Sequence, residues 1–227
     1  MCGRFTLRAT VGTVAEQFAI FELPPFSPRF NIAPTQPVPV VRLDPETSRP
    51  NRQLVWLHWG LIPSWAKDPA IGNRMINARA ETAAEKPSYR AAMRRRRCLI
   101  VADGFYEWQK TTDRKQPYFI HMADQRPFAF AGLWEAWEGA DHSYIESCTI
   151  LTTEPNDLLR PIHNRMPVIL AAEHYDRWLD PTTREANEVL PLLKPFSSDP
   201  MAAYPVGTLV NNPKNDEPAC VAVDSLF

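Results

Sequence analysis

The chain has 227 residues, of which 25 are basic and 26 acidic, and its formal net charge of -1 excludes a protein that binds nucleic acid through a global excess of positive charge. Its 23 prolines against 8 glycines favour short strands and fixed turns over long helices. The four cysteines have no CxxC spacing, and no signal peptide or membrane-length apolar run is present. We therefore expect one soluble, cytoplasmic domain over residues 1–227, with no metal and no cofactor.

The first half of the chain predicts a mixture of short elements. Apolar residues at helical spacing predict a helix over residues 11–21, and the prolines after it predict an irregular loop to residue 35. Residues 37–43 and 53–60 are predicted strands around a turn.

The next segment, residues 77–97, reads as helical and is interrupted at Pro87. The four arginines at its end, residues 94–97, fit a solvated helix end better than a basic rim beside a DNA groove.

From residue 98 onward the pattern changes to strands. Runs rich in aromatic and β-branched residues, separated by charged or Gly/Asp turns, predict strands at residues 98–108, 116–122, 127–137, 143–153 and 166–171. Short helices are predicted at residues 173–180 and 184–193. No strand–helix unit repeats and no glycine-rich phosphate loop occurs. The sequence thus predicts a β-rich α+β domain.

Cys2 raises the first functional question. The second residue of a chain is ordinarily frayed and exposed, and an exposed thiol there invites oxidation. The sequence MCGRF therefore indicates either an accident or an N-terminus that carries the chemistry.

Other polar residues are ambiguous when taken singly. His163 fits a packed histidine, Glu107 an edge-strand carboxylate and Asn77 a helix cap, and for each the structural interpretation is preferred. Glu107 differs in that it lies within an aromatic strand, GFYEW, where an ionised carboxylate is costly. A raised pKa or a buried partner is expected for Glu107.

Two tryptophans belong to the segment WGLIPSWAKD. Trp59 ends an alternating strand and is predicted to be in the core. Trp65 lies in a proline-marked loop, where core packing and a surface platform for a nucleobase are both open. The nearby Arg4, Arg74 and Arg79 fit either anion binding or surface ion pairs.

Read together, these fragments resemble the SOS response-associated peptidase family of abasic site processing proteins. The resemblance covers nearly the whole chain in the family's order, through the following motifs: MCGRF, FNIAPT (residues 30–35), WGLIPSWAKD (59–68), NARAET (77–82), RCLIVADGFYEW (97–108), FAGLWEAW (130–137), TILTTEPN (149–156) and IHNRMPVIL (162–170).

The resemblance implies a fold of mainly antiparallel strands with short flanking helices, and a role for particular residues. By this likeness Cys2 is the nucleophile once Met1 is removed, and Asn77, Glu107 and His163 are the other catalytic residues. The residues that the likeness assigns to DNA binding are Arg4, Pro34, Trp65, Arg79 and Thr152. The implied partner is single-stranded DNA with an abasic site, including single-strand/double-strand junctions, and the expected state is a monomer. The family name also implies self-processing peptidase activity, and a lyase-like activity is expected beside it.

The chemistry of Cys2 suits this role. At pH 7 about 15 % of an ordinary α-amine is unprotonated, against about 0.04 % of a lysine amine, so the N-terminus forms imines far more readily. The adjacent thiol then closes a five-membered thiazolidine on the aldehyde carbon of an opened abasic site.

Three alternatives stay open at this stage. An N-terminal-nucleophile hydrolase, such as a glutamine amidotransferase domain, also begins with Cys-Gly. A papain-like peptidase fits less well, because no cysteine has the expected context. A non-catalytic single-strand-binding module would not need Cys2.

Overall fold

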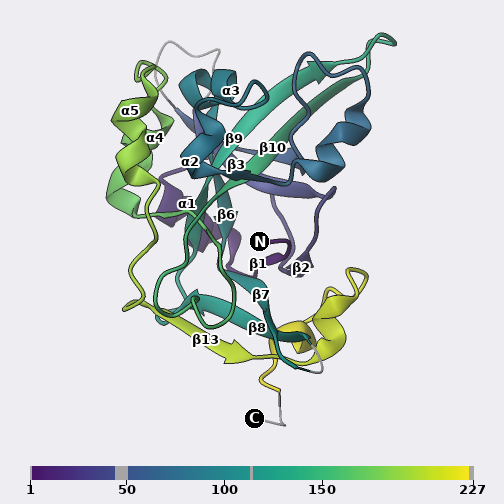
Figure 1. Ribbon diagram of the computed structural model, residues 1–227, viewed down its shortest axis with the longest axis vertical. Helices are drawn as coiled ribbons and strands as arrows, with labels where there is room; N and C mark the ends of the chain where they lie inside the picture. The colour runs from purple at the N-terminus through teal and green to yellow at the C-terminus, as the bar shows by residue number, and fades with distance from the viewer. Residues whose placement is uncertain (1, 44–50, 113–114, 225–227) are drawn as a thin grey trace.

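In the part of the chain that the structure describes, the strands form two sheets with short helices at their edges (Figure 1). The computed structural model describes residues 2–43, 51–112 and 115–224. The smaller sheet has, in spatial order, β13 (Met201–Pro205), β8 (Lys115–Met122), β7 (Gly104–Lys110), β1 (Phe5–Leu7) and β2 (Arg29–Ile32). Its neighbouring strands are antiparallel throughout.

The larger sheet curls into a barrel. Along its main path the strands are, in spatial order, β11 (Met166–Pro167), β10 (Tyr144–Thr153), β4 (Arg52–Trp59), β3 (Pro37–Leu43), β6 (Arg97–Ala102), β9 (Phe128–Glu138) and β12 (Ile169–Leu170). An eighth strand, β5 (Asn77–Arg79), lies off this path and pairs with β10. Strand β10 pairs with β4 in parallel and also with β9 in antiparallel orientation. The path β10-β4-β3-β6-β9 therefore closes on itself, which removes free sheet edges from the barrel.

Aromatic side chains join the two sheets. The ring of Phe5 from β1 packs edge-on against Trp59 of β4, with centroids 5.1 Å apart, and against Phe130 of β9, at 5.8 Å. Phe105 of β7 makes a similar contact with Phe130 at 5.8 Å. All four rings are buried, as predicted for Trp59, so the first strand of the chain is held against the barrel by the main core.

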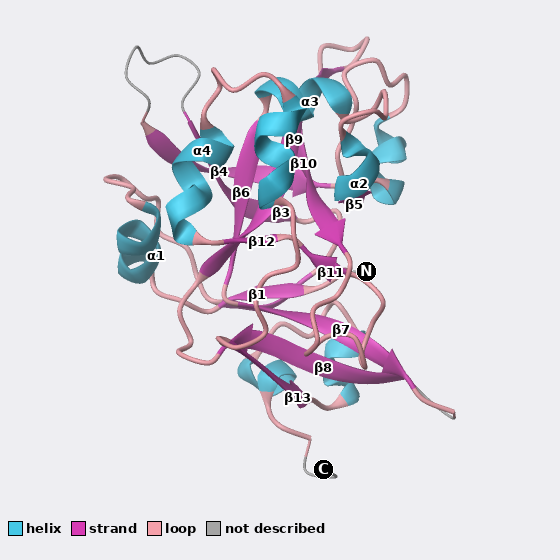
Figure 2. Cartoon of the chain, turned by 60° about the vertical axis from the view of Figure 1, so that its left-hand side comes forward, coloured by secondary structure: helices cyan, strands magenta, loops and turns pink. Residues whose placement is uncertain are grey.

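Helices are short and lie around the barrel (Figure 2). They are α1 (Val11–Phe18), α2 (Ala80–Ala83), α3 (Arg90–Arg95), α4 (Tyr175–Leu179) and α5 (Ala186–Val189), with 3-10 turns η1 (Pro69–Arg74), η2 (Ala172–His174), η3 (Leu190–Leu192), η4 (Thr208–Asn211) and η5 (Pro218–Val221). Within the described residues, none of them has the length and apolar content needed to cross a membrane.

The predicted fold class, a β-rich α+β domain of mainly antiparallel strands, is confirmed, but several of its elements are wrong. Residues 29–32, expected in an irregular loop, form β2, and residues 166–171, expected as one strand, form β11 and β12. Two further corrections concern residues 77–79 and 98–108. Residues 77–79 were expected to begin a helix and instead form strand β5 (Asn77–Arg79), because their backbone pairs in parallel with Ile150–Thr152 of β10. The helix begins only at Ala80. The turn predicted between β3 and β4 falls on residues 44–51, of which 44–50 lie outside the described residues.

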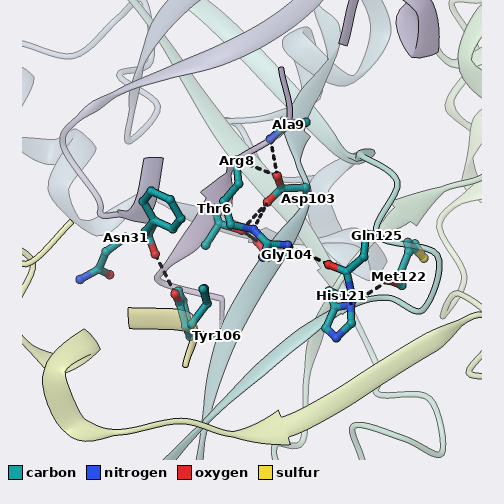
Figure 3. A network of polar contacts seen from close by, with 12 residues as sticks. Thr6, Arg8, Ala9, Asn31, Asp103, Gly104, Tyr106, His121, Met122 and Gln125 are labelled. Atoms are coloured by element: carbon teal, nitrogen blue, oxygen red, sulfur yellow. Dashed lines mark hydrogen bonds and ion pairs between the residues drawn. The ribbon is translucent and has the colours of Figure 1, made fainter. Parts of the chain in front are cut away.

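The second correction concerns residues 98–108, which were predicted as one strand. The structure divides them at Asp103 into β6 and β7, which belong to different sheets. Figure 3 shows why the chain turns there: the buried carboxylate of Asp103 accepts hydrogen bonds from the Thr6 hydroxyl at 2.5 Å and from the backbone N–H groups of Arg8 and Ala9, the latter at 2.7 Å. One side chain thus fixes the end of β1 beside the start of β7.

Replacing Asp103 with alanine is expected to lower the free energy of unfolding by about 2–4 kcal/mol, because four buried or half-buried donors, including Arg8 Nε at 3.2 Å, lose their acceptor at once. Urea denaturation measures the change. Asp124→Ala is the matched control: this aspartate is exposed, and its ion pair with Arg126 lies at the surface, so a change within about 0.5 kcal/mol is expected. Equal effects of the two variants would contradict the role of Asp103.

Candidate functional site

The four residues predicted to be catalytic come together where the two sheets meet. The chain begins there, with β5 on one side and β7 on the other (Figure 2). The Asn77 amide donates a hydrogen bond to the Cys2 carbonyl at 2.7 Å, and His163 Nε2 lies 4.0 Å from Glu107 Oε2. The charge of Glu107 acts on the Cys2 thiol. Four residues that are up to 161 positions apart in sequence, from Cys2 to His163, therefore lie close together around the Cys2 side chain and backbone.

Cys2 is a buried group, unlike an ordinary second residue. Its side chain is 0 % exposed, and its Sγ–H points to the Arg4 carbonyl at 3.7 Å. Burial, followed by the negative charge of Glu107, raises the pKa of the Cys2 thiol well above the ordinary value. The group is thus a protonated thiol near neutral pH, which protects it from oxidation.

Glu107 occupies the fourth position of strand β7, directly opposite Tyr118 of β8 in the strand register. The side chain is 2 % exposed. Loss of hydration on burial raises its pKa to about 7, which agrees with the expectation from the aromatic strand. A carboxyl group of this kind exchanges protons at physiological pH, as a general acid or base must.

His163 lies in the turn before β11, and its ring is oriented by the backbone of Arg165. The Arg165 N–H lies 3.0 Å from His163 Nδ1, and the Arg165 carbonyl lies 3.2 Å from the same atom. When Nδ1 accepts from the N–H, the proton of the neutral ring is on Nε2, the atom that faces Glu107. Burial lowers the pKa of His163, which favours this neutral form.

Asn77 is held by the pairing of β5 with β10, in register with Ile150. Its Nδ2 binds the Cys2 carbonyl, whereas its Oδ1 is buried and, within the described residues, accepts no hydrogen bond. A buried amide oxygen without a donor is costly, so this atom is suited to accept a hydrogen bond from an incoming ligand.

The residues predicted to bind DNA fall into two groups. Trp65 and Arg79 are exposed and Pro34 is half-buried, so these side chains are accessible. In contrast, Thr152 is buried, and its hydroxyl donates to the Ala78 carbonyl at 3.3 Å. The Arg4 guanidinium is engaged in hydrogen bonds within the protein.

Arg4 connects the N-terminal strand with the end of the chain. Its guanidinium donates to Asn31 Oδ1 at 2.9 Å, to the Val210 carbonyl at 2.7 Å and to the Asn211 carbonyl at 3.3 Å. Asp216 in turn accepts from the backbone of Asn31 at 2.9 Å. Residues 210–216 therefore pack against the FNIAPT motif and form hydrogen bonds with it. No pattern in the sequence indicated this contact.

Trp65 lies on a loop with a fixed geometry. It is 58 % exposed and borders a pocket of about 330 Å³ that Lys67, Ile71 and Arg74 also line. The Trp137 indole N–H donates to the Ala66 carbonyl at 2.7 Å and so fixes the loop next to Trp65. An exposed ring on a fixed loop suits stacking on a planar ligand.

The base of the same loop is held by two glycines. Gly60 has a φ of 140°, and a Cβ at this position would come 2.6 Å from the Gly72 carbonyl. Only glycine permits both this conformation and the close approach of the two backbone segments.

The chain is similar to known proteins over nearly its whole length. Residues 1–213 match the family model described as SOS response associated peptidase (SRAP). The chain is 44 % identical over 225 residues to the abasic site processing protein YoqW of Bacillus subtilis (strain 168), covering 97 % of this chain and 99 % of that protein. It is 32 % identical to the abasic site processing protein HMCES of Xenopus tropicalis, covering 87 % of this chain and 66 % of that protein.

A solved structure has the same fold. A protein from Bacteroides thetaiotaomicron superimposes with a TM-score of 0.86 at 27 % identity, covering 98 % of this chain and all of that chain. Similarity in sequence and in structure thus extends over nearly the whole length.

Proposed function

Because the chain belongs to the SOS response associated peptidase family, we propose that it captures abasic sites in single-stranded DNA by forming a covalent thiazolidine through Cys2. The names of the relatives support the processing of abasic sites in DNA. The convergence of Glu107, His163 and Asn77 on Cys2 is the observation that carries the proposal for the covalent step.

The proposed reaction needs a free α-amine at Cys2, so Met1 is removed first. The amine adds to the aldehyde of the ring-opened sugar, and the addition product loses one water to give an imine. The thiol sulfur then adds to the imine carbon, forming a C–S bond, while the thiol proton passes to nitrogen. Both nucleophiles belong to one residue, so the second step is intramolecular. Ring closure converts the imine into a thiazolidine and so prevents hydrolysis of the imine.

Glu107 supplies the proton transfers in this scheme. Because its pKa is about 7, it is partly protonated and partly ionised at neutral pH. The ionised form accepts the proton of the Cys2 thiol, which burial otherwise keeps in place, and the protonated form assists the loss of water.

His163 and Asn77 act on the sugar and on the backbone of the nucleophile. His163, with its Nε2 proton toward Glu107, exchanges a proton with the sugar hydroxyl during ring opening and, in reverse, during release. Asn77 fixes the Cys2 carbonyl through Nδ2 and has Oδ1 available for the reacting amine.

Recognition of the strand is assigned to the accessible residues. Trp65 stacks on a base next to the abasic site, Pro34 wedges against a neighbouring base, and Arg79 holds a flanking phosphate. Such contacts need unpaired bases, which favours single strands and junctions over continuous duplex. Few phosphates are bound, in agreement with a net charge of -1.

Intact-mass spectrometry of the mature protein mixed with an abasic-site oligonucleotide tests the proposal. The expected mass is that of protein plus oligonucleotide less one water. Glutamine hydrolysis without an adduct would instead indicate an N-terminal-nucleophile hydrolase, and strand binding without an adduct would indicate a non-catalytic module.

Trp65→Ala is expected to weaken non-covalent binding of single-stranded DNA by about 1–3 kcal/mol, because one base loses its stacking partner. Fluorescence anisotropy measures this with an oligonucleotide that carries a tetrahydrofuran in place of the abasic sugar and has no aldehyde to react. Trp56→Ala is the matched control. Trp56 is 38 % exposed on β4 and packs on Phe26, and no DNA contact is assigned to it, so this variant is expected to bind the oligonucleotide with unchanged affinity. Equal affinities of the Trp65 variant and the unmodified protein would refute stacking at this residue.

A further inference from the structure

Glu81 binds Arg165 through both carboxylate oxygens. Arg165 Nη1 lies 2.6 Å from Glu81 Oε1 and Nη2 lies 2.9 Å from Oε2. The same Nη2 donates to the Thr152 carbonyl at 2.6 Å. A two-pronged pair with a third contact fixes the plane of the guanidinium as well as its position.

Because the Arg165 side chain is fixed, the Arg165 backbone that binds His163 is fixed as well. The Arg165 backbone N–H lies 3.0 Å from His163 Nδ1, and only one residue separates the two positions. The orientation of the imidazole therefore depends on where the Arg165 backbone lies. Arg165 is in turn held through its side chain, by Glu81 and by the end of β10.

Glu81 also belongs to the opposite wall of the site. It is the second residue of α2, which follows directly on β5, the strand that carries Asn77. The Glu81–Arg165 pair thus connects the segment that holds the Cys2 backbone with the segment that holds the imidazole. These segments are 84 residues apart in sequence.

The surroundings of the pair favour a geometric role over a role in stability. The Glu81 side chain is 49 % exposed, and ion pairs of this exposure contribute little to folding. The Arg165 side chain is only 16 % exposed, so without Glu81 its charge lacks the anion that holds it. The hydrogen bonds from Arg165 lower the pKa of Glu81, which is therefore ionised at neutral pH.

We propose that Glu81 is a positioning residue for His163, acting through Arg165. It orients the imidazole toward Glu107 and the sugar hydroxyl without touching the DNA, because Arg165 occupies both of its oxygens. This inference rests on the proposed function for the step that His163 performs.

A double-mutant cycle tests the proposal. The rates of adduct formation and of exchange onto competitor abasic DNA are measured for the unmodified protein, Glu81→Gln, His163→Ala and the double variant. Glu81→Gln is expected to slow exchange about 3- to 10-fold, as for residues coupled in one network, and to have no further effect when His163 is absent. Equal slowing in both backgrounds, or none in either, would overturn the proposal.

The matched control is Glu85→Gln, which makes the same change of charge at an exposed position four residues later and leaves Arg165 paired. It is expected to leave exchange unchanged. Slowing equal to that of Glu81→Gln would reduce the effect to general electrostatics and so overturn the positioning role.

A measurement without DNA separates this inference from the proposed function. NMR titration of the His163 ring is expected to show its lowered pKa moving toward the ordinary histidine value in Glu81→Gln, since a ring that loses its orientation is better hydrated. Glu85→Gln is expected to leave the titration unchanged. An unchanged His163 titration in Glu81→Gln counts against positioning whether or not the protein forms an adduct.

Discussion

Replacing Cys2 with serine is expected to reduce the yield of stable adduct on abasic single-stranded DNA on the order of 100-fold or more. The serine variant keeps the α-amine and still forms an imine. Its hydroxyl, however, closes a ring far less durably than sulfur does, so the imine hydrolyses. Denaturing gel electrophoresis after mixing with an abasic oligonucleotide measures the yield, and borohydride trapping reveals the imine that the serine variant is expected to form.

Two controls make this result specific. Cys98→Ala removes another fully buried thiol, in the barrel, and is expected to crosslink normally. A form that retains Met1 lacks the free Cys2 amine and is expected to give no adduct. Crosslinking by the Met1 form at the rate of the mature protein would show that the α-amine is not the nucleophile.

Replacing Glu107 with glutamine is expected to slow adduct formation by roughly 100-fold or more, the usual loss when a positioned acid or base is removed. The rate of the unmodified protein is expected to show the titration of Glu107 around pH 7 in addition to that of the Cys2 α-amine, and the rate of the variant is expected to keep only the titration of the amine. Glu138→Gln, at an exposed carboxylate on β9, is the control and should leave both rate and pH profile unchanged. A normal rate for Glu107→Gln would remove Glu107 from the mechanism.

The same substitution is expected to stabilise the fold at high pH. In the native protein the pKa of Glu107 is about 7, raised from an ordinary value of 4.5. Below pH 4.5 the Glu107 carboxyl group is protonated in both the native and the unfolded protein. As pH rises to 7 the unfolded form releases the proton first, so native stability falls by about 3 kcal/mol, a loss that is complete above pH 7. Urea denaturation at pH 5 and pH 8 measures this effect. The free energy of unfolding of Glu107→Gln, relative to that of the unmodified protein, is expected to be higher at pH 8 than at pH 5.

The strands of the barrel were readily predictable, whereas the short strands were not. Segments such as residues 127–137 and 143–153 have enough aromatic and β-branched residues to indicate strands by composition. Strands β1 and β2 have only three and four residues, and β2 follows a proline-rich loop. At Asn77–Arg79 the partner strand overrides a helical composition, and partners distant in sequence leave no local signal.

The sequence indicated which residues the structure brings together at the candidate site, but not the contacts between them. The motifs indicated Cys2, Asn77, Glu107 and His163, and the aromatic strand indicated the raised pKa of Glu107. The burial of Cys2, the internal partners of Arg4 and the ion pair of Glu81 with Arg165 depend on tertiary pairing.

The position of β1 between β2 and β7 has a consequence during biosynthesis. Cys2 is made before the rest of its site: β7 follows about a hundred residues later and His163 later still. At about 5–20 residues per second, roughly 8–32 s separate the synthesis of Cys2 from that of His163. Until these segments are made, the thiol lacks part of the surroundings that bury it and raise its pKa, so it is closer to an ordinary, oxidisable cysteine. The growing polypeptide is thus more vulnerable at this residue than the finished protein.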